Sequence, residues 1–269
     1  MKKAAVAETA VEGVAVAAII CAAGASSRMT GPNGGQKKEY RPLCSKATGK
    51  LASLTVLGAT VRAFAALPEI QTIVVAVPDD PVTGEVAARK AIPPALLSGK
   101  IGPPVHFVAG GKTRRLSVYN ALSILPEKFL GRLDARSYVL IHDGARPWIR
   151  PSFIRRIIAE VKKHPAVIPV LPLTETPKET TLALDGSLGS GPVYVKHHLR
   201  RACVGISQTP QAFAFPEILD LHDLAEEHEN ITGMEFTDDA EIWGTFYGSV
   251  AVIPGDPQNR KITFPEDLT

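Results

Sequence analysis

The chain has 269 residues, with 30 basic and 27 acidic side chains and therefore a formal net charge of +3. So small an excess excludes a coat of positive charge that binds nucleic acid unaided. A composition of 45% hydrophobic and 21% charged residues excludes a disordered or fibrous protein. The three cysteines (Cys21, Cys44 and Cys203) form no C-x-x-C pair. We therefore expect neither a zinc ribbon nor a disulfide framework. We expect the protein to reside in a reducing compartment, the cytoplasm.

The chain is predicted to begin with a flexible tail, residues 1–13, followed by one domain over residues 14–269. The run Met1-Lys2-Lys3 ahead of alanines and valines imitates a secretory signal, but Glu8 and Glu12 interrupt the apolar stretch. No stretch approaches the roughly 18 uninterrupted apolar residues of a membrane helix. We therefore expect neither a secreted nor a membrane-bound protein.

Short apolar runs that alternate with helical segments predict an α/β fold. The runs are rich in valine and isoleucine and apolar on both faces, which is typical of buried parallel strands. The expected strands are 14–21, 70–77, 105–108, 138–142, 166–171 and 249–253. The expected helices are 51–67, 82–97, 114–125 and 151–163, and Pro93-Pro94 ends or breaks the second of them. In such a fold, ligands bind at the carboxyl ends of the strands.

The first strand runs into Ala22-Ala23-Gly24-Ala25, and a basic residue, Arg28, follows. Small side chains let backbone N–H groups surround a phosphate, and Arg28 adds a planar cation. Lys37-Lys38-Glu39 brings further positive charge to the same region. A tight strand-to-helix turn with a solvated basic patch is the alternative interpretation. No G-x-G-x-x-G follows the strand, so the dinucleotide-binding fingerprint is absent.

A glycine pair, Gly110-Gly111, precedes the helix expected to begin at Arg114. Such a pair allows backbone groups to hydrogen-bond to the edge of a base. The alternative interpretation is that the arginines after the pair are only solvent-exposed residues at the start of a helix. Both Arg114 and Arg115 oppose the helix dipole there, which favours a functional interpretation. The following Lys112-Thr113 imitates the end of a P-loop, but the first glycine of that motif would fall at His106, so a P-loop NTPase is excluded.

Asp143 stands at the carboxyl end of a buried strand, where ligands lie. Its carboxylate can hold Mg²⁺ on a triphosphate, because Mg²⁺ prefers few, hard oxygen ligands. A turn or helix cap is the alternative role. The neighbouring His142 is expected to be a packed strand residue rather than a ligand, since no second His or Cys lies at ligand spacing. The same expectation holds for His197-His198, which point to opposite faces of a strand.

Residues 172–208 break the alternation of strands and helices. Asp185-Gly186 and the glycines 189 and 191 are turn signals between two extended stretches. The segment therefore predicts an arm that leaves the main sheet. A mobile surface loop is the alternative interpretation.

A series of motifs stands in a specific order along the chain. They are Ala22-Ala23-Gly24 with Arg28-Met29, Lys38-Glu39-Tyr40, Gly110-Gly111 with Arg114 and Ser117-Val118, Ile141-His142-Asp143-Gly144-Ala145-Arg146-Pro147, Thr209-Pro210-Gln211, Thr237-Asp238, and Lys261-Ile262-Thr263 with Pro265-Glu266-Asp267-Leu268. The series resembles the 2-C-methyl-D-erythritol 4-phosphate cytidylyltransferase family over roughly residues 16–268.

The resemblance implies a Rossmann-like, three-layer nucleotidyltransferase fold with a mostly parallel sheet and an extended β-arm for dimerisation. The implied reaction transfers the cytidylyl group of CTP to 2-C-methyl-D-erythritol 4-phosphate and releases pyrophosphate, in non-mevalonate isoprenoid biosynthesis. Mg²⁺ or another divalent cation is the implied cofactor. The implied partners are CTP, a polyol phosphate and a second copy of the chain, with no nucleic acid and no membrane.

The resemblance also implies a role for each matching residue. Arg28 and Lys38 match the catalytic cations that stabilise the transition state at the α-phosphate. The residues that match nucleotide-binding positions are Ala22, Ala23, Gly24, Ala25, Gly110, Gly111, Arg114 and Ser117. Those that match positions at the sugar phosphate are Arg146, Thr176, Arg201, Thr209 and Lys261. Asp143 matches the metal carboxylate.

The chain departs from the family pattern at Ser26, where glycine is usual, and at Glu39, where glutamine is common. Lys37 beside Lys38 leaves open which lysine is catalytic. Ribitol 5-phosphate cytidylyltransferase, with the same fold and chemistry, is the closest alternative. A glycosyltransferase would need an Asp-x-Asp motif, which Asp143-Gly144-Ala145 lacks. A binding module without catalysis would have lost cations that this sequence retains.

Overall fold

The computed structural model describes residues 15–26, 29, 37–43, 54–125, 137–182 and 191–268. The expected N-terminal tail and Arg28 lie outside these residues, so both remain predictions. None of the helices within the described ranges combines the length and apolar character that crossing a lipid bilayer requires.

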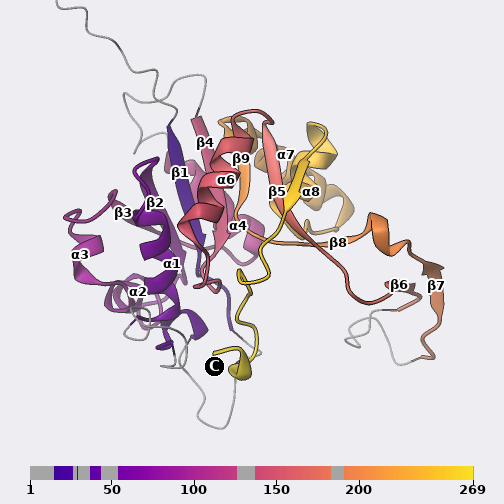
Figure 1. Cartoon of the computed structure of the whole chain (residues 1–269), viewed down its shortest axis with the longest axis horizontal. Coiled ribbons are helices and arrows are strands. Elements are labelled where there is room, and N and C mark those ends of the chain that lie inside the picture. Colours follow the sequence, from indigo (N-terminus) through magenta and orange to yellow (C-terminus); the bar gives the residue numbers. More distant parts are fainter. Residues whose placement is uncertain are drawn as a thin grey trace, which may run out of the picture.

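A mixed sheet forms the centre of the molecule, with eight strands in the described part of the chain (Figure 1). The strands are β1 (Val16–Cys21), β2 (Ile70–Val77), β3 (Val105–Ala109), β4 (Ser137–Asp143), β5 (Ala166–Pro172), β8 (Gly205–Ser207), β9 (Gln211–Phe215) and β10 (Ala251–Pro254). Their order is β10-β5-β9-β4-β1-β2-β3, with β8 paired to β5. Strand β9 is antiparallel to β4 and β5, and β8 is antiparallel to β5, whereas the remaining pairs are parallel. The expected mostly parallel sheet is confirmed.

Helices cover both faces of this sheet. One face is covered by α1 (Val56–Ala65), α2 (Glu85–Ala91), α3 (Pro94–Leu97) and α6 (Pro151–Val161), and the other by α4 (Arg114–Ser123), α7 (Glu217–Thr232) and α8 (Asp239–Phe246). Side chains alternate along β1, so that Ala18 and Ile20 enter the first core while Ala17 and Ile19 enter the second. Because each face buries its own apolar layer, the three-layer architecture follows, as expected.

The arm leaves the main sheet after β5. Within it, β6 (Lys178–Thr180) and β7 (Val195–His198) form a separate antiparallel pair, and η4 (Arg201–Cys203) leads into β8. Figure 1 shows this pair standing well away from the sheet and its helices. The two extended stretches predicted from the sequence are therefore confirmed. The turn expected between them lies at residues 183–190, outside the described residues, and a role in dimerisation stays a prediction.

The predicted helix boundaries need correction. Helix α1 begins only at Val56, because the Thr55 side chain accepts a hydrogen bond from Gly58 N and caps the helix there. The segment 82–97 contains two helices, α2 and α3, separated at Ile92 and Pro93, both of which have extended backbone. A proline disfavours the helical conformation in the residue that precedes it, and Ile92 and Pro93 each precede a proline, which explains the break.

The segment 211–246 is missing from the predicted elements, although the structure places β9, α7 and α8 there. Helix α7 buries Ile218, Leu221 and Ala225, which follow helical spacing. It begins with acidic residues and ends at Gly233, whose φ of 69° is the left-handed cap that glycine favours. These signals were readable, but α7 is largely polar and its apolar stripe is narrow.

Candidate active site

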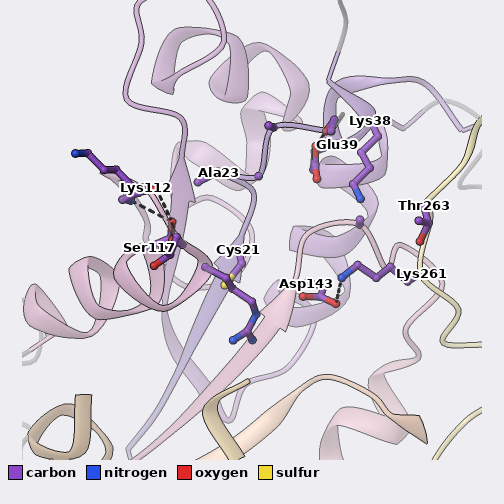
Figure 2. Close-up of a pocket in the computed structure, with 16 residues that line it drawn as sticks. Cys21, Ala23, Lys38, Glu39, Lys112, Ser117, Asp143, Lys261 and Thr263 are labelled. Atoms are coloured by element: carbon purple, nitrogen blue, oxygen red, sulfur yellow. Dashed lines mark hydrogen bonds and ion pairs between the residues drawn. The ribbon is translucent and has the colours of Figure 1, made fainter. Parts of the chain in front are cut away.

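A pocket of about 400 Å³ opens at the carboxyl ends of β1 and β4 (Figure 2). It is lined by Cys21, Ala23, Gly24, Ala25, Ser26, Lys38, Glu39, Gly111, Lys112, Thr113, Arg114, Ser117, Asp143, Ala145, Lys261 and Thr263. The register of the parallel pair β1–β4 places Cys21 opposite Asp143. The end of the first strand and the predicted metal carboxylate therefore meet at one edge of the sheet, where α/β folds bind ligands.

The glycine pair brings two of the predicted binding loops together. A Cβ at Gly110 would lie 2.3 Å from the Ala23 Cβ, and a Cβ at Gly111 would lie 2.3 Å from the Leu116 Cβ. Neither position therefore has room for a side chain. The Ser117 hydroxyl accepts a hydrogen bond from Gly111 N at 3.1 Å and so fixes the loop to the first turn of α4. Gly24, in contrast, faces open space, which leaves its backbone accessible to a ligand.

The two adjacent lysines have different surroundings. Lys38 lines the pocket, as Figure 2 shows, whereas Lys37 is 7% exposed and its Nζ donates a hydrogen bond to Gly24 O. Burial lowers the pKa of Lys37, although Glu39 opposes this effect. Lys37 therefore holds the loop after β1 from behind, and Lys38 is the lysine that can reach a bound ligand.

The two departures from the family pattern contact each other. Ser26 has a φ of 54°, the left-handed region that favours glycine. Its hydroxyl donates a hydrogen bond to Oε2 of Glu39 at 3.1 Å. The Glu39 side chain is 3% exposed, and burial raises its pKa. The Ser26–Glu39 contact thus joins the loop after β1 to η2 (Lys38–Tyr40), the short helix that carries Lys38.

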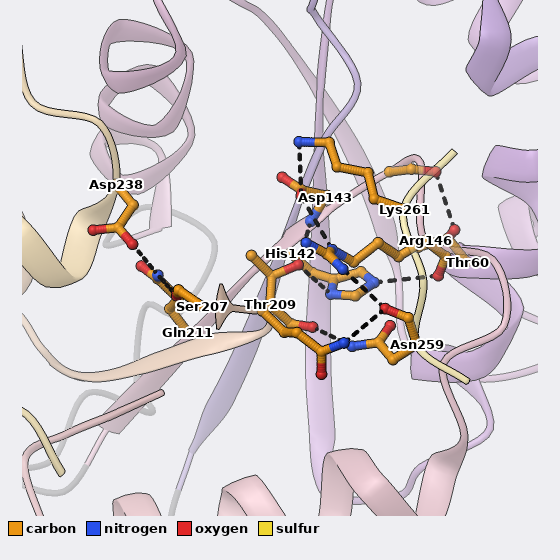
Figure 3. A network of polar contacts seen from close by, with 12 residues as sticks. Thr60, His142, Asp143, Arg146, Ser207, Thr209, Gln211, Asp238, Asn259 and Lys261 are labelled. Carbon is orange, nitrogen blue, oxygen red and sulfur yellow. Dashed lines mark hydrogen bonds and ion pairs between the residues drawn. The ribbon is translucent and has the colours of Figure 1, made fainter. Parts of the chain in front are cut away.

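Asp143 is held by two cations (Figure 3). Its Oδ2 lies 3.2 Å from Nε of Arg146 and 3.1 Å from Nζ of Lys261. Burial alone would raise the pKa of Asp143, but Lys261, Arg114 and Arg146 outweigh it and hold that pKa well below the usual range. Asp143 is therefore a carboxylate at any physiological pH.

A buried polar network lies behind Asp143. The Thr209 hydroxyl accepts a hydrogen bond from Asp143 N at 3.1 Å and lies 3.0 Å from Nδ1 of His142. Arg146 donates to Asn259 O at 2.8 Å, and Asn259 donates to Thr209 O at 2.7 Å. Burial lowers the pKa of His142 to about 3, so the ring is neutral. His142 is the packed strand residue that the sequence predicts.

The C-terminal segment delivers Lys261 and Thr263 to the pocket. Ile262 donates its N–H to Ala145 O at 2.9 Å and packs its fully buried side chain against Val56 and Ala59 of α1. Because neighbouring residues of an extended segment point to opposite sides, burial of Ile262 leaves both its neighbours facing the pocket. Thr263 and Cys21 also line the pocket, although no sequence pattern predicts a role for either residue there.

The structure gathers most, but not all, of the predicted site residues. Those that line the pocket are Ala23, Gly24, Ala25, Gly111, Arg114, Ser117, Lys38, Asp143 and Lys261. Ala22, Gly110, Arg146 and Thr209 lie behind this lining, where the last two support Asp143. Thr176 and Arg201 are exposed on the arm and are not among the lining residues. Arg201 donates a hydrogen bond to Thr174 O at 2.6 Å.

The donor set at Asp143 fits a magnesium ion that is shared with a phosphate ligand. Within the described ranges, no group of three or more His, Cys, Asp or Glu side chains gathers as a metal cage made by protein alone would require. Mg²⁺ is usually bound through one or two carboxylates together with substrate phosphates. Both ion pairs of Asp143 involve Oδ2, so Oδ1 is the oxygen that can turn towards such an ion.

Comparison with known proteins gives a consistent result. Residues 16–269 match the family model described as IspD: 2-C-methyl-D-erythritol 4-phosphate cytidylyltransferase. The bifunctional enzyme IspD/IspF of Brucella anthropi is 34% identical over 256 residues, which are 94% of this chain and 53% of that protein. The chain thus spans about half the length of the first curated relatives it matches. The 2-C-methyl-D-erythritol 4-phosphate cytidylyltransferase of Acidobacterium capsulatum is 32% identical over 250 residues. The match covers 93% of this chain and 92% of that protein.

A solved structure has the same fold. The crystal structure of 4-diphosphocytidyl-2C-methyl-D-erythritol synthase from Anaerococcus prevotii superposes with a TM-score of 0.67 at 26% sequence identity. The match covers 96% of this chain and 94% of that one. The mostly parallel α/β architecture is therefore one that this chain shares with a solved structure.

Proposed function

This chain belongs to the 2-C-methyl-D-erythritol 4-phosphate cytidylyltransferase family, and we propose that it transfers the cytidylyl group of CTP to 2-C-methyl-D-erythritol 4-phosphate in isoprenoid biosynthesis. One observation carries the proposal. The pocket combines Lys38 and Lys261 with the carboxylate of Asp143, beside a glycine pair that has no room for side chains. Cations for phosphates, an oxygen ligand for a metal and a closely packed glycine loop beside the base are the parts this transfer needs.

The reaction requires no nucleophile from the protein. A phosphate oxygen of the acceptor attacks the α-phosphorus of CTP, and pyrophosphate leaves from the opposite side. Catalysis of such a transfer depends on positioning the reactants and on neutralising the charge that develops. Among the described residues, we assign to Lys38 the role of neutralising this developing charge. Arg28 lies outside the described residues, and the family resemblance assigns the same role to it.

Asp143 has two tasks in this proposal. Its carboxylate holds the ammonium group of Lys261 at 3.1 Å and therefore sets where that charge meets the acceptor phosphate. It is also the residue that would hold Mg²⁺ or another divalent cation against the triphosphate. When bound, this cation withdraws charge from the phosphate oxygens.

The base-reading part of the site is the glycine pair and the first turn of α4. Gly111 N and the Ser117 hydroxyl already interact, and Thr113 caps α4 by accepting from Leu116 N. We propose that backbone groups of residues 109–117 bind cytosine at its edge, in a space that fits a pyrimidine. A mismatched base would leave buried polar groups without partners, which strongly disfavours its binding.

We further propose that the working enzyme is a homodimer whose arm completes the partner's site. The support is the exposure of the arm: Tyr194 is 66% and Val195 48% exposed, and the predicted phosphate ligands Thr176 and Arg201 do not line the pocket of their own chain. Pairing across a two-fold axis would cover these side chains and the exposed strand edges. A cytoplasmic location is part of this proposal and agrees with the free thiols of Cys21 and Cys203.

Pyrophosphate release with defined substrate pairs tests the proposed function. The chain is assayed with CTP, UTP, ATP or GTP, each with 2-C-methyl-D-erythritol 4-phosphate or ribitol 5-phosphate and with Mg²⁺. We expect turnover only with CTP and the methylerythritol phosphate, and its loss when EDTA removes the cation. Faster turnover of ribitol 5-phosphate would contradict the assigned acceptor, and equal turnover of ATP would contradict the assigned base site.

A further inference from the structure

Asp239 is a fully buried carboxylate that reaches the wall of the pocket from behind. It is the first residue of α8, and its side chain is 0% exposed. Its Oδ2 lies 2.8 Å from Nη2 of Arg114, whose side chain is 31% exposed and lines the pocket. A residue distant in sequence, on a helix that contributes no lining residue, therefore contacts the predicted base-reading segment.

The start of α8 is fixed to the sheet. Gln211, the first residue of β9, donates to Oδ2 of Asp238 at 2.7 Å (Figure 3). It also accepts a hydrogen bond from Ala240 N at 3.0 Å. Asp238 also caps the helix by accepting from Glu241 N at 2.9 Å. Because hydrogen bonds hold the residues on both sides of Asp239, its carboxylate has little freedom to move.

The second oxygen of Asp239 faces a histidine. Nε2 of His222, on α7, lies 3.3 Å from Oδ1, and the His222 side chain is also 0% exposed. The ring of Tyr119 stacks on His222 with a centroid distance of 6.4 Å. Burial alone raises the pKa of Asp239, but Arg114 and His222 outweigh it and hold that pKa at about 2. Asp239 is therefore charged, and both of its oxygens have a neighbour.

We propose that Asp239 is a positioning residue of the nucleotide site, which fixes the guanidinium of Arg114 and thereby the first turn of α4 before CTP binds. An arginine without a partner samples many rotamers, and the lost freedom weakens binding when a ligand selects one of them. Asp239 removes that loss in advance. This inference rests on the proposed function, because CTP is the ligand it invokes.

The neighbouring arginine supplies a matched control. Nε of Arg115 lies 2.6 Å from Oε2 of Glu229 on α7, and the Arg115 side chain is 5% exposed. Arg115 does not line the pocket. The two arginines are adjacent on one helix. The Arg114–Asp239 pair contains a buried carboxylate and the Arg115–Glu229 pair a buried arginine. Only the Arg114–Asp239 pair reaches the site.

The test compares Asp239→Asn with Glu229→Gln, since each substitution removes one charge and keeps the shape. CTP binding to the full chain is measured by calorimetry, and kcat and KM are measured separately. For Asp239→Asn we expect the Kd and KM for CTP to rise about tenfold, with kcat within about threefold of wild type. For Glu229→Gln we expect all three constants within about twofold, even if both variants melt at lower temperature.

Three further variants cover the case in which the single variant Asp239→Asn does not fold. Arg114→Lys keeps the charge beside Asp239 but removes the planar fork, and we expect it to raise the Kd for CTP several-fold. Arg114→Ala and the double variant Arg114→Ala/Asp239→Asn should bind CTP equally, because Asp239 acts through Arg114. Unchanged or tighter CTP binding in Asp239→Asn, or equal weakening in Glu229→Gln, overturns the inference. A wild-type chain that binds no CTP would instead overturn the proposed function.

Discussion

The pocket and the arm differ in how their charged side chains are held. Asp143 in the pocket has two cations within 3.2 Å and a buried network behind it. On the arm, Glu179 pairs with Lys196 and His197, all three of which are exposed. Surface pairs of this kind contribute little to stability. The comparison teaches that one chain by itself pre-arranges the charged side chains of the pocket, Lys261 included, whereas the charged side chains of the arm lie in solvent. In the proposed dimer, contact with the partner subunit would arrange them.

The largest effect is expected from Lys38, because its charge matters most when the transferring phosphoryl group gains charge. We expect Lys38→Ala to lower kcat about 10²–10³-fold while the KM for CTP changes far less. Lys37→Met should instead lower the melting temperature, since the hydrogen bond from Lys37 to Gly24 O is lost. Steady-state kinetics and thermal melting of both variants separate the two roles.

The reverse pattern would contradict this placement of the two lysines. If Lys37→Met loses kcat with an unchanged melting temperature and Lys38→Ala stays within about threefold of wild type, the catalytic lysine is the one that the structure buries. If both variants are mildly affected, the transition-state charge is neutralised elsewhere.

The proposed division of the site between two chains predicts recovery of activity on mixing. Lys38→Ala disables the pocket side and Arg201→Ala the arm side of every site. After subunit exchange at equal amounts, half of the dimers are mixed, and each mixed dimer contains one site with both sides intact. Activity should therefore recover to about a quarter of wild type. No recovery, despite exchange demonstrated by tagged subunits, would show that each chain completes its own site.

The sequence predicted the pocket side of this comparison well. A buried strand that ends in small residues and a second strand that ends in Asp143 specify a site at the edge of a parallel sheet, because the geometry follows from the alternation of strands and helices. The pairing of Lys261 with Asp143 was harder to predict from the sequence. It depends on Ile262 entering a small core against α1, which brings together segments far apart in sequence.

Other parts of the site could not be predicted from local patterns. The sequence shows Gln211 and Asp238 only as members of short motifs, whereas the structure shows that they bind each other and fix α8. Arg146 and Thr209, which the resemblance assigns to the acceptor phosphate, lie behind Asp143 and hydrogen-bond to it, and their role at the phosphate stays a prediction. A side chain next to a site in the sequence can point either into the pocket or into the core, and packing decides between the two.

A smaller effect is expected at the contact between Ser26 and Glu39. Ser26→Ala keeps the Cβ and the backbone conformation but removes the hydroxyl that donates to the buried carboxylate. We expect the free energy of unfolding to fall by about 1–2 kcal/mol in Ser26→Ala. In a Glu39→Gln background the same change should cost about half as much or less, because a hydrogen bond to a neutral amide is weaker.

Ser26→Gly serves as the matched comparison for this pair. Glycine also removes the hydroxyl, but it adopts a φ of 54° without strain. It should therefore recover about 0.5–1 kcal/mol relative to Ser26→Ala. Chemical denaturation of the four single and double variants measures these differences. Equal costs of Ser26→Ala in both backgrounds would show that the contact with Glu39 adds nothing to stability.

The smallest effect concerns the thiol at the base of the pocket. Burial raises the pKa of Cys21 to about 12, so the reactive thiolate is rare at neutral pH. We expect the alkylation rate of Cys21 by iodoacetamide, followed by peptide mass mapping, to rise about tenfold per pH unit from 7 to 10 without levelling. In urea the same cysteine should level off above about pH 9, because an exposed thiol has a pKa near 8.5. A plateau below pH 10 in the native chain would show that the pocket is open to water down to the end of β1.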